Sequence, residues 1–383
     1  ARRDDDFTVL LPHLTEVVSL TRRVGEAKAS ALGLSAYDAL ADEYEPGMRE
    51  AALTPLFGRI ATVLPPLVDA IVEAQARAPA PPADGGPFPV EHQAALGRHL
   101  AERMGFDFER GRLDVSAHPF CGGAAEDVRM TTRYDERDFL ASAFAVIHET
   151  GHALYELGLP REWARQPVGR VPGMGLHESQ SLLMEMQAAR TPELLGWLAG
   201  VAAEHLGRPL APDVLAGSAL RVERSLIRVD ADEATYPLHV VVRFDLERAL
   251  LSGDLSVRDL PLAFRDAMER VVGIRPMDDR DGCLQDVHWP TGTFGYFPTY
   301  TIGAIAAAQL FAAACEADPT IPSALARGSF GPLRAFAAER VHRHGGRFTT
   351  DQILEQATGR PLDVDALFGH LRRRYLGAAG SAA

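Results

Sequence analysis

The spacing of apolar residues constrains this chain most, because over most of its length they recur every three or four positions. Residues 7–31 and 53–76 follow this pattern, which places apolar side chains on one face of an amphipathic helix. Proline and glycine in "ARAPAPPADGGPFPV" (76–90) interrupt it, since neither continues a helix. Another helix is expected over about residues 91–104, ending at Gly105. The sequence therefore predicts a mainly α-helical protein.

A different period of apolar residues appears after the third helical stretch. "GRLDVSAHPF" (111–120) and "EDVRMTTRY" (126–134) alternate apolar and polar residues, as half-buried strands do, and "CGGAAE" lies between them. We predict a β-hairpin or a small sheet here. After Asp135 the helical period returns and continues almost to the end of the chain.

Composition and charge exclude several classes of protein. The 383 residues are 46% hydrophobic and 24% charged, as in an ordinary globular protein. A net charge of −13 argues against a partner with a phosphate backbone. We find no apolar run near the ~20 residues that cross a membrane, and no signal peptide. Three widely spaced cysteines favour a reducing compartment. We expect a cytoplasmic protein that binds neither nucleic acid nor membranes.

The segment "FAVIHETGHALYELGLP" (144–160) contains two histidines four residues apart. Asp135 or Asp138 can cap a helix here, and Gly158 and Pro160 can end it. The two histidines then lie one turn apart on the same helix face.

That arrangement predicts a metal site. His148 and His152 offer ring nitrogens to one ion, as zinc requires. Glu149 lies one residue further round the helix, where its carboxylate can reach a metal-bound water rather than the metal. The alternative is a pair of half-buried histidines with backbone partners.

A catalytic zinc site takes three protein ligands and a water. Glu156 continues the same face, but it lies roughly 12 Å along the axis from the first histidine. A helix expected from about His177 offers Glu178 in its first turn, and Glu185 competes two turns deeper. We predict Glu178 as the third ligand, with His177 or Ser179 supporting it.

Blocks along essentially the whole chain resemble the carboxypeptidase Taq family of zinc metallocarboxypeptidases. They are "YDALADEYEPGM" (37–48), "HPF" (118–120), "DVRMT" (127–131), "HETGH" (148–152), "HESQ" (177–180), "IRVDAD" (227–232), "GCLQDVHW" (282–289) and "GYFPTYTIG" (295–303).

The resemblance implies a two-lobed helical metallopeptidase with a deep central cleft, the small sheet lying near its active site. It also implies a homodimer that releases single C-terminal residues from peptides with broad specificity, using one Zn²⁺ per chain or Co²⁺ as a substitute. We expect one metallocarboxypeptidase catalytic domain over 1–383, with N-terminal helices in 1–105, their loop at 76–90, and a catalytic core over 106–383. Relatives normally carry an additional N-terminal helical segment, which we expect this chain to lack.

Peptide hydrolysis needs an activated water, a stabilised oxyanion and a proton for the leaving amine. Glu149 would accept the proton of a zinc-bound water and pass it to the amine. By analogy with angiotensin-converting enzyme, where a histidine and a tyrosine act, we assign Tyr300 or Tyr296 to the oxyanion and His288 to the substrate carbonyl. Core packing is the alternative for either tyrosine.

A carboxypeptidase must also recognise a terminal carboxylate, which a guanidinium can bind through two hydrogen bonds. The resemblance gives Arg228 as the first candidate and Arg129 as the second. An ion pair on the strand surface is the alternative for Arg129. His118 and His239 are further substrate-binding candidates.

Two other functions are compatible with these residues. An oligopeptidase or dipeptidyl carboxypeptidase would cleave capped C-termini or release dipeptides. A catalytically impaired relative would only bind peptides, although Glu149 argues against it because a binder does not need a base.

Overall fold

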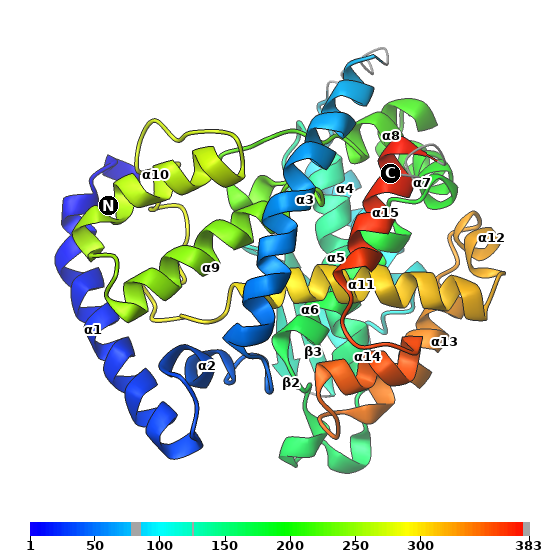
Figure 1. Cartoon of the computed structure of the whole chain (residues 1–383). Coiled ribbons are helices and arrows are strands. Elements are labelled where there is room, and N and C mark those ends of the chain that lie inside the picture. The colour runs from blue at the N-terminus through cyan, green and yellow to red at the C-terminus, as the bar shows by residue number, and fades with distance from the viewer. Residues whose placement is uncertain (78–85, 125, 378–383) are drawn as a thin grey trace. The chain divides into compact units, whose positions relative to one another are not determined.

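The computed structural model describes residues 1–77, 86–124 and 126–377, and most of them are helical (Figure 1). The chain forms two compact units. The first unit comprises Ala1–Arg77, Val222–Thr301 and Phe368–Ala383, and the second comprises Ala78–Arg221 and Ile302–Leu367. The prediction of a mainly α protein is confirmed. A single catalytic domain over 1–383 and its cleft stay predictions.

The first unit is built from helices whose apolar faces meet. In α1 the buried residues Phe7, Leu14 and Val18 recur at helical steps, as the period predicted. Helix α9 packs against α3 and α10, and Phe57 of α3 lies against Phe244 of α9 with ring centroids 4.6 Å apart. The elements of this unit are η1 (Arg2–Asp4), α1 (Phe7–Leu32), α2 (Ala36–Ala41), α3 (Glu50–Ala76), η5 (Arg228–Asp230), α9 (Tyr236–Ser252), η6 (Val257–Asp259) and α10 (Leu260–Val271).

The second unit has one large apolar core, formed by α4, α5, α7 and the helices that follow residue 302. Its elements are α4 (Val90–Met104), β1 (Gly111–Val115), β2 (Cys121–Ala124), β3 (Asp127–Thr132), α5 (Phe139–Gly158), η2 (Arg161–Trp163), η3 (Pro167–Gly169), α6 (Met174–Leu182), η4 (Leu183–Ala188), α7 (Pro192–Leu206), α8 (Pro212–Ala219), α12 (Ile321–Leu325), α13 (Gly331–Arg340), η7 (His342–His344) and α14 (Thr350–Thr358). Two helices, α11 (Pro298–Ala317) and α15 (Val364–Leu376), run from one unit into the other.

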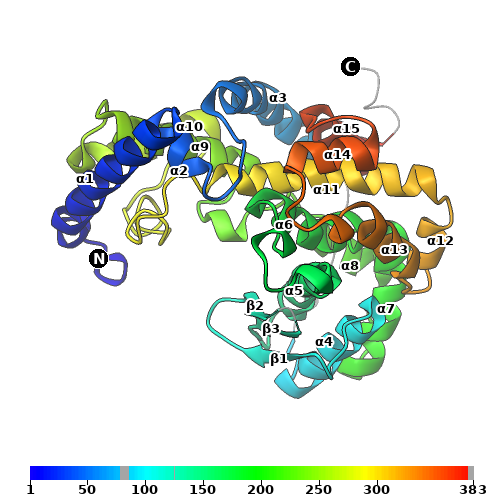
Figure 2. The ribbon, with the colours of Figure 1, turned by 90° about the horizontal axis from the view of Figure 1, so that it is seen from below.

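The sheet has the strand order β1-β3-β2 and lies beside α5 (Figure 2). The expected small sheet is confirmed, but a hairpin of the two predicted strands is wrong. β1 pairs with β3 in parallel, with Gly111 opposite Val128. The antiparallel partner of β3 is β2, in the "CGG" segment that we expected only to connect them. The period of two identifies strands but does not reveal their direction.

The predicted break between the second and third long helices is confirmed, since α3 ends at Ala76 and α4 begins at Val90. Of the predicted loop 76–90, residues 78–85 lie outside the described part. The expectation that no apolar run could cross a membrane was wrong by length and composition. Helices α3 and α11 are both long enough and apolar enough to do so. Much of α11 is nevertheless core: Ala306, Leu310 and Ala314 are buried among protein side chains.

Candidate metal centre

Helix α5 carries the two histidines as the sequence predicted. Asp138 caps its first turn, accepting hydrogen bonds from the backbone N–H groups of Leu140 at 3.0 Å and Ala141 at 3.2 Å. Such a cap satisfies donors that have no partner within the helix. The helix ends at Gly158. Between its ends, His148 and His152 lie on one face, with ring centroids 4.9 Å apart.

Glu178 of α6 completes a group of three potential metal ligands. The donor atoms of His148, His152 and Glu178 all lie within 4.8 Å of one another. Oε2 of Glu178 is 3.3 Å from Nε2 of His152 and 3.8 Å from Nε2 of His148. Tetrahedral zinc with bonds of ~2.0–2.1 Å separates its ligand atoms by about 3.3 Å. The three side chains therefore fit one such ion.

The close approach of α6 to α5 depends on a glycine inside the histidine motif. A Cβ atom added to Gly151 would lie 2.6 Å from the backbone oxygen of Gln180 and 2.7 Å from Cα of Ser181. No side chain tolerates such distances, so only glycine lets the two backbones meet here. The third residue of "ETG" thereby brings Glu178 within reach of both histidines.

Two local predictions about α6 were wrong. The helix begins at Met174, so Glu178 lies in its second turn rather than its first. Ser179 does not touch the Glu178 carboxylate, because its hydroxyl donates to the backbone oxygen of Leu176 at 2.7 Å. Ser181, one turn further, donates to the Glu178 backbone oxygen at 2.6 Å and lies 3.4 Å from Oε2.

Glu149 is buried beside the metal group, and its Oε2 has no hydrogen-bond partner among the described residues. Burial raises its pKa to about 7, with the positive charge of His148 opposing and the negative charge of Glu178 adding to the rise. A carboxylate with a pKa near neutrality can both accept and return a proton. Glu149 therefore has the burial and the basicity of a general base.

The pKa values of the three potential ligands depend on the charges of their neighbours. Burial lowers the pKa of His148, but Glu178 and Glu185 outweigh burial and raise it to about 10. Burial and the neighbouring His177 lower the pKa of His152 to about 4. Burial raises the pKa of Glu178, but the two histidines outweigh it and lower the value to about 2. A metal ion binding here would displace the proton from His148.

The competing glutamates do not belong to the ligand group. Glu185 lies on η4, a π-helical turn, and its Oε2 is 3.0 Å from Nδ1 of His148, on the far side of the ring from Glu178. Glu156, which helix geometry excluded, lies 3.0 Å from Nε2 of His177. His177, predicted to support Glu178, contributes electrostatically to the lowered pKa of that carboxylate. Its ring stacks on His152, with centroids 4.3 Å apart.

In the first unit, Arg228 lies in a buried ion cluster. Its Nε donates to Oδ1 of Asp286 at 2.9 Å, and its Nη1 donates to the hydroxyl of Tyr236 at 2.6 Å. Arg243, fully buried, donates to Oδ2 of the same carboxylate at 2.7 Å. Two guanidinium groups therefore share one carboxylate, which leaves the cluster with an excess positive charge. Sequence reasoning missed Asp286, Arg243 and Tyr236 as parts of this cluster.

His288 and both candidate tyrosines also lie together in the first unit. Nε2 of His288 is 3.0 Å from the Tyr300 hydroxyl, and the rings of Tyr296 and Tyr300 are in edge contact at 5.2 Å. Burial, followed by the charge of Arg228, lowers the pKa of His288 to about 4. The imidazole is therefore neutral at physiological pH and can offer a single N–H.

The positions of the other three substrate-binding candidates, Arg129, His118 and His239, give weaker support for that role. Arg129 is exposed on β3 and forms an ion pair with Asp127 at 2.7 Å, the alternative we considered. His118 is exposed in the loop before β2. His239 is completely buried in α9, and burial followed by Arg243 lowers its pKa to about 3.

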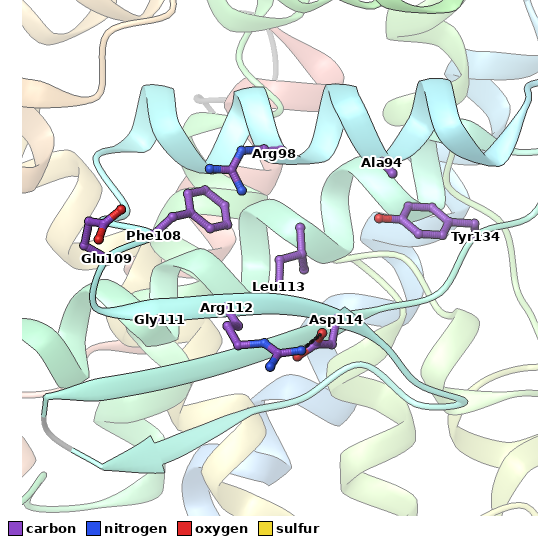
Figure 3. Close-up of a pocket in the computed structure, with 9 residues that line it drawn as sticks. All are labelled: Ala94, Arg98, Phe108, Glu109, Gly111, Arg112, Leu113, Asp114 and Tyr134. Carbon is purple, nitrogen blue, oxygen red and sulfur yellow. Dashed lines mark hydrogen bonds and ion pairs between the residues drawn. The ribbon is translucent and has the colours of Figure 1, made fainter.

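A hollow of about 450 Å³ lies between α4 and β1 in the second unit (Figure 3). Both of the arginines that line it have partners. Arg98 lies over the Phe108 ring, 3.9 Å from its centroid, and Arg112 donates to Asp114 at 2.7 Å. None of the predicted site residues lines it. We therefore assign it no part in the chemistry.

Comparison with known proteins shows which family the chain belongs to. The model of the carboxypeptidase Taq (M32) metallopeptidases matches residues 1–375. The chain belongs to this family. It is thus a carboxypeptidase, an enzyme that hydrolyses peptide bonds, and the family requires a divalent metal, for which the His148, His152 and Glu178 group is suited.

The M32 relatives resemble this chain over nearly all of its length. Thermostable carboxypeptidase 1 of Thermus thermophilus is 40% identical, over 99% of this chain and 76% of that protein. Carboxypeptidase 1 of Bacillus subtilis is 36% identical, over 98% of this chain and 75% of that protein. The solved structure of Trypanosoma cruzi metallocarboxypeptidase 1 is 41% identical with a TM-score of 0.95, over 98% of this chain and 76% of that one. The chain thus spans about three quarters of its relatives.

Proposed function

We propose that this protein is a zinc-dependent metallocarboxypeptidase that removes single residues from the free C-termini of peptides with broad specificity. The convergence of His148, His152 and Glu178, with Glu149 buried beside them, carries the proposal. Two nitrogens and one carboxylate oxygen form a donor set typical of catalytic zinc. The proposal includes a cytoplasmic homodimer, with Co²⁺ as an alternative ion, on the strength of the family resemblance.

Glu149 acts as general base and then as general acid in this proposal. When bound, zinc supplies Lewis-acid polarisation of the scissile carbonyl and makes a water more acidic. Glu149 takes a proton from the attacking water and delivers it to the departing amine. The burial of its carboxylate and the lack of a hydrogen-bond partner for Oε2 among the described residues support this role, because that oxygen can accept a proton.

Arg228 is the proposed partner of the terminal carboxylate. Three of the five N–H groups of a guanidinium suffice for its bonds to Asp286 and Tyr236, which leaves two for an incoming carboxylate. Arg243 shares Asp286, so one carboxylate does not neutralise the cluster. An anion entering it would restore the balance of charge. Arg129, His118 and His239 remain secondary proposals for substrate binding.

His288 and the two tyrosines are proposed as donors to the substrate. A neutral His288 and Tyr300 carry one donor proton each, and one of these protons forms the bond between them. We propose that substrate replaces this bond, so that His288 donates to the peptide carbonyl and the hydroxyl of Tyr300 or Tyr296 donates to the oxyanion that develops. We place Tyr300 first because its hydroxyl lies 3.0 Å from Nε2 of His288.

The test is mass spectrometry of short peptides incubated with the zinc-loaded protein, each peptide supplied with a free and with an amidated C-terminus. We expect stepwise loss of single residues from the free form alone. Glu149→Gln should abolish this loss, whereas Glu162→Gln, a matched change on the surface, should not.

Each other result points to a different function. Release of dipeptides, or cleavage of the amidated peptides, would make the protein a dipeptidyl carboxypeptidase or an oligopeptidase. Peptide binding without cleavage by a protein that holds zinc would make it a binding relative.

A further inference from the structure

The two histidines of the metal group are held in place by different means. His148 places its Nδ1 3.0 Å from Oε2 of Glu185. Nδ1 of His152 is buried and has no hydrogen-bond partner within the described part of the chain. His152 instead stacks on His177, with ring centroids 4.3 Å apart and planes 14° apart. On the side of the ring that faces away from Glu178, His148 is therefore held by a hydrogen bond to a carboxylate, whereas His152 is held by ring contact.

Glu185 is itself fixed. Its second oxygen, Oε1, accepts a hydrogen bond from Nη2 of Arg190 at 2.8 Å. Arg190 also donates to the backbone oxygen of Ala219, and its guanidinium lies over the Phe144 ring, 4.3 Å from the centroid. Because both carboxylate oxygens of Glu185 are engaged, it cannot turn to bind the ion without breaking these contacts.

His177 is held from its other side. Its Nε2 lies 3.0 Å from Oε1 of Glu156, which lies one turn beyond His152 on α5. This pair keeps the His177 ring parallel to His152 and therefore limits the rotation of that ligand. The pair of His177 and Glu156 does not provide Nδ1 of His152 with a hydrogen bond to a carboxylate.

We propose that Glu185 is a positioning residue that directs Nε2 of His148 toward the metal and strengthens it as a ligand, while His177 only orients His152. This inference rests on the proposed zinc site. A histidine that donates its Nδ1–H to a carboxylate keeps one tautomer and one ring orientation, and its Nε2 becomes more basic. Ring stacking supplies orientation but no added basicity. His148 is thus the more firmly held of the two ligands.

The experiment measures the dissociation constant for Zn²⁺ by competition with a chromophoric chelator, for the parent protein and its variants. We expect Glu185→Ala to weaken zinc binding about 10- to 100-fold, the usual cost of losing such a partner. Glu185→Gln keeps an oxygen that can accept from Nδ1 but loses the charge, so its affinity should lie between. His177→Ala should weaken binding less than Glu185→Ala does. Glu162→Gln is the control for loss of an exposed glutamate.

Folding is checked independently by circular dichroism and thermal unfolding of the metal-free variants. If Glu185→Ala fails to fold, the comparison of Glu185→Gln with the parent decides. Zinc affinity within about threefold of the parent in folded Glu185 variants would overturn the inference while leaving the proposed function intact. A parent protein that binds no stoichiometric zinc would instead overturn the proposed function. A purely structural role would lower the unfolding temperature of the metal-free protein without the graded order of affinities.

Discussion

Gly303 of α11 lies directly against Glu178, the carboxylate of the metal group. A Cβ atom added at Gly303 would lie 2.8 Å from both Cβ and Cγ of Glu178 and 3.1 Å from the backbone oxygen of Gly175. Gly151 makes the corresponding approach from α5. Helix α6 therefore passes between two glycines, and this packing sets the position of Glu178.

Gly303→Ala should displace Glu178 and weaken zinc binding at least tenfold. Overpacking of this kind typically lowers the free energy of unfolding by about 1–3 kcal/mol. Gly200→Ala in α7 is the matched control, because a Cβ there meets nothing within 4 Å and alanine favours a helix. Chelator competition and urea unfolding of both variants test this. Equal zinc affinity in the two would show that the contact does not position Glu178.

Asp286→Asn should destabilise the first unit, because it leaves Arg228 and Arg243 buried without their shared carboxylate. Removing one partner of a buried ion pair typically costs about 3–5 kcal/mol. The exposed pair of Arg129 and Asp127 provides the control, since Asp127→Asn should leave urea unfolding unchanged.

Asp286→Asn should also raise KM for peptides with a free C-terminus while affecting kcat less, because Asp286 orients Arg228. Steady-state kinetics on one peptide series measures both constants. An unchanged KM in a folded variant would contradict the proposed role of Arg228.

Glu247 should make stability depend on pH. It is buried, it accepts a hydrogen bond from the Tyr37 hydroxyl at 2.7 Å, and burial raises its pKa to about 7. An unfolded glutamate titrates near 4.3, so between ~4.3 and 7 the folded state binds more protons than the unfolded state. The stabilisation is therefore complete below pH ~4.3 and is lost as pH rises through 7.

Glu247→Gln removes this dependence. Between pH 4.5 and 8, the free energy of unfolding of the parent should fall relative to the variant by on the order of 3 kcal/mol. Urea unfolding at several pH values measures the difference. Parallel pH profiles for parent and variant would show that Glu247 does not titrate in this range.

Removal of zinc by a chelator should lower the thermal stability of the protein. An ion that binds only the folded state at 100 times its dissociation constant stabilises it by about 2.7 kcal/mol. His148→Ala should abolish the response to zinc, whereas Glu162→Gln should retain it. Calorimetry with and without free zinc compares the proteins, and a shift of equal size in His148→Ala would place the bound ion elsewhere.

Local signals predicted a large part of this structure. The period of apolar residues predicted α1 and α4 nearly to their ends. Asp138, one of the two predicted caps, and Gly158 mark the limits of α5. The pair of histidines followed from helix geometry, because four residues make about one turn. These features depend only on neighbours in the sequence.

Pairings over long sequence distances were not predictable in the same way. Strand period could not reveal that β1 runs parallel to β3. Sequence distance could not show that Glu185 lies behind His148 rather than beside Glu178. Arg243 and Asp286 are 43 positions apart, and only the packing of α9 against the "GCLQDVHW" segment brings them together. The glycines at 151 and 303 carry no chemistry, and their roles appear only when α6 lies between them.

The ligand group itself is tested most directly by a crystal structure of the zinc-loaded protein, with anomalous scattering recorded on both sides of the zinc absorption edge. We expect one peak per chain, bound by Nε2 of His148, Nε2 of His152 and the carboxylate of Glu178, with Glu185 contacting only Nδ1 of His148. A peak coordinated by Glu185 or Glu156, or located away from the two histidines, would contradict it.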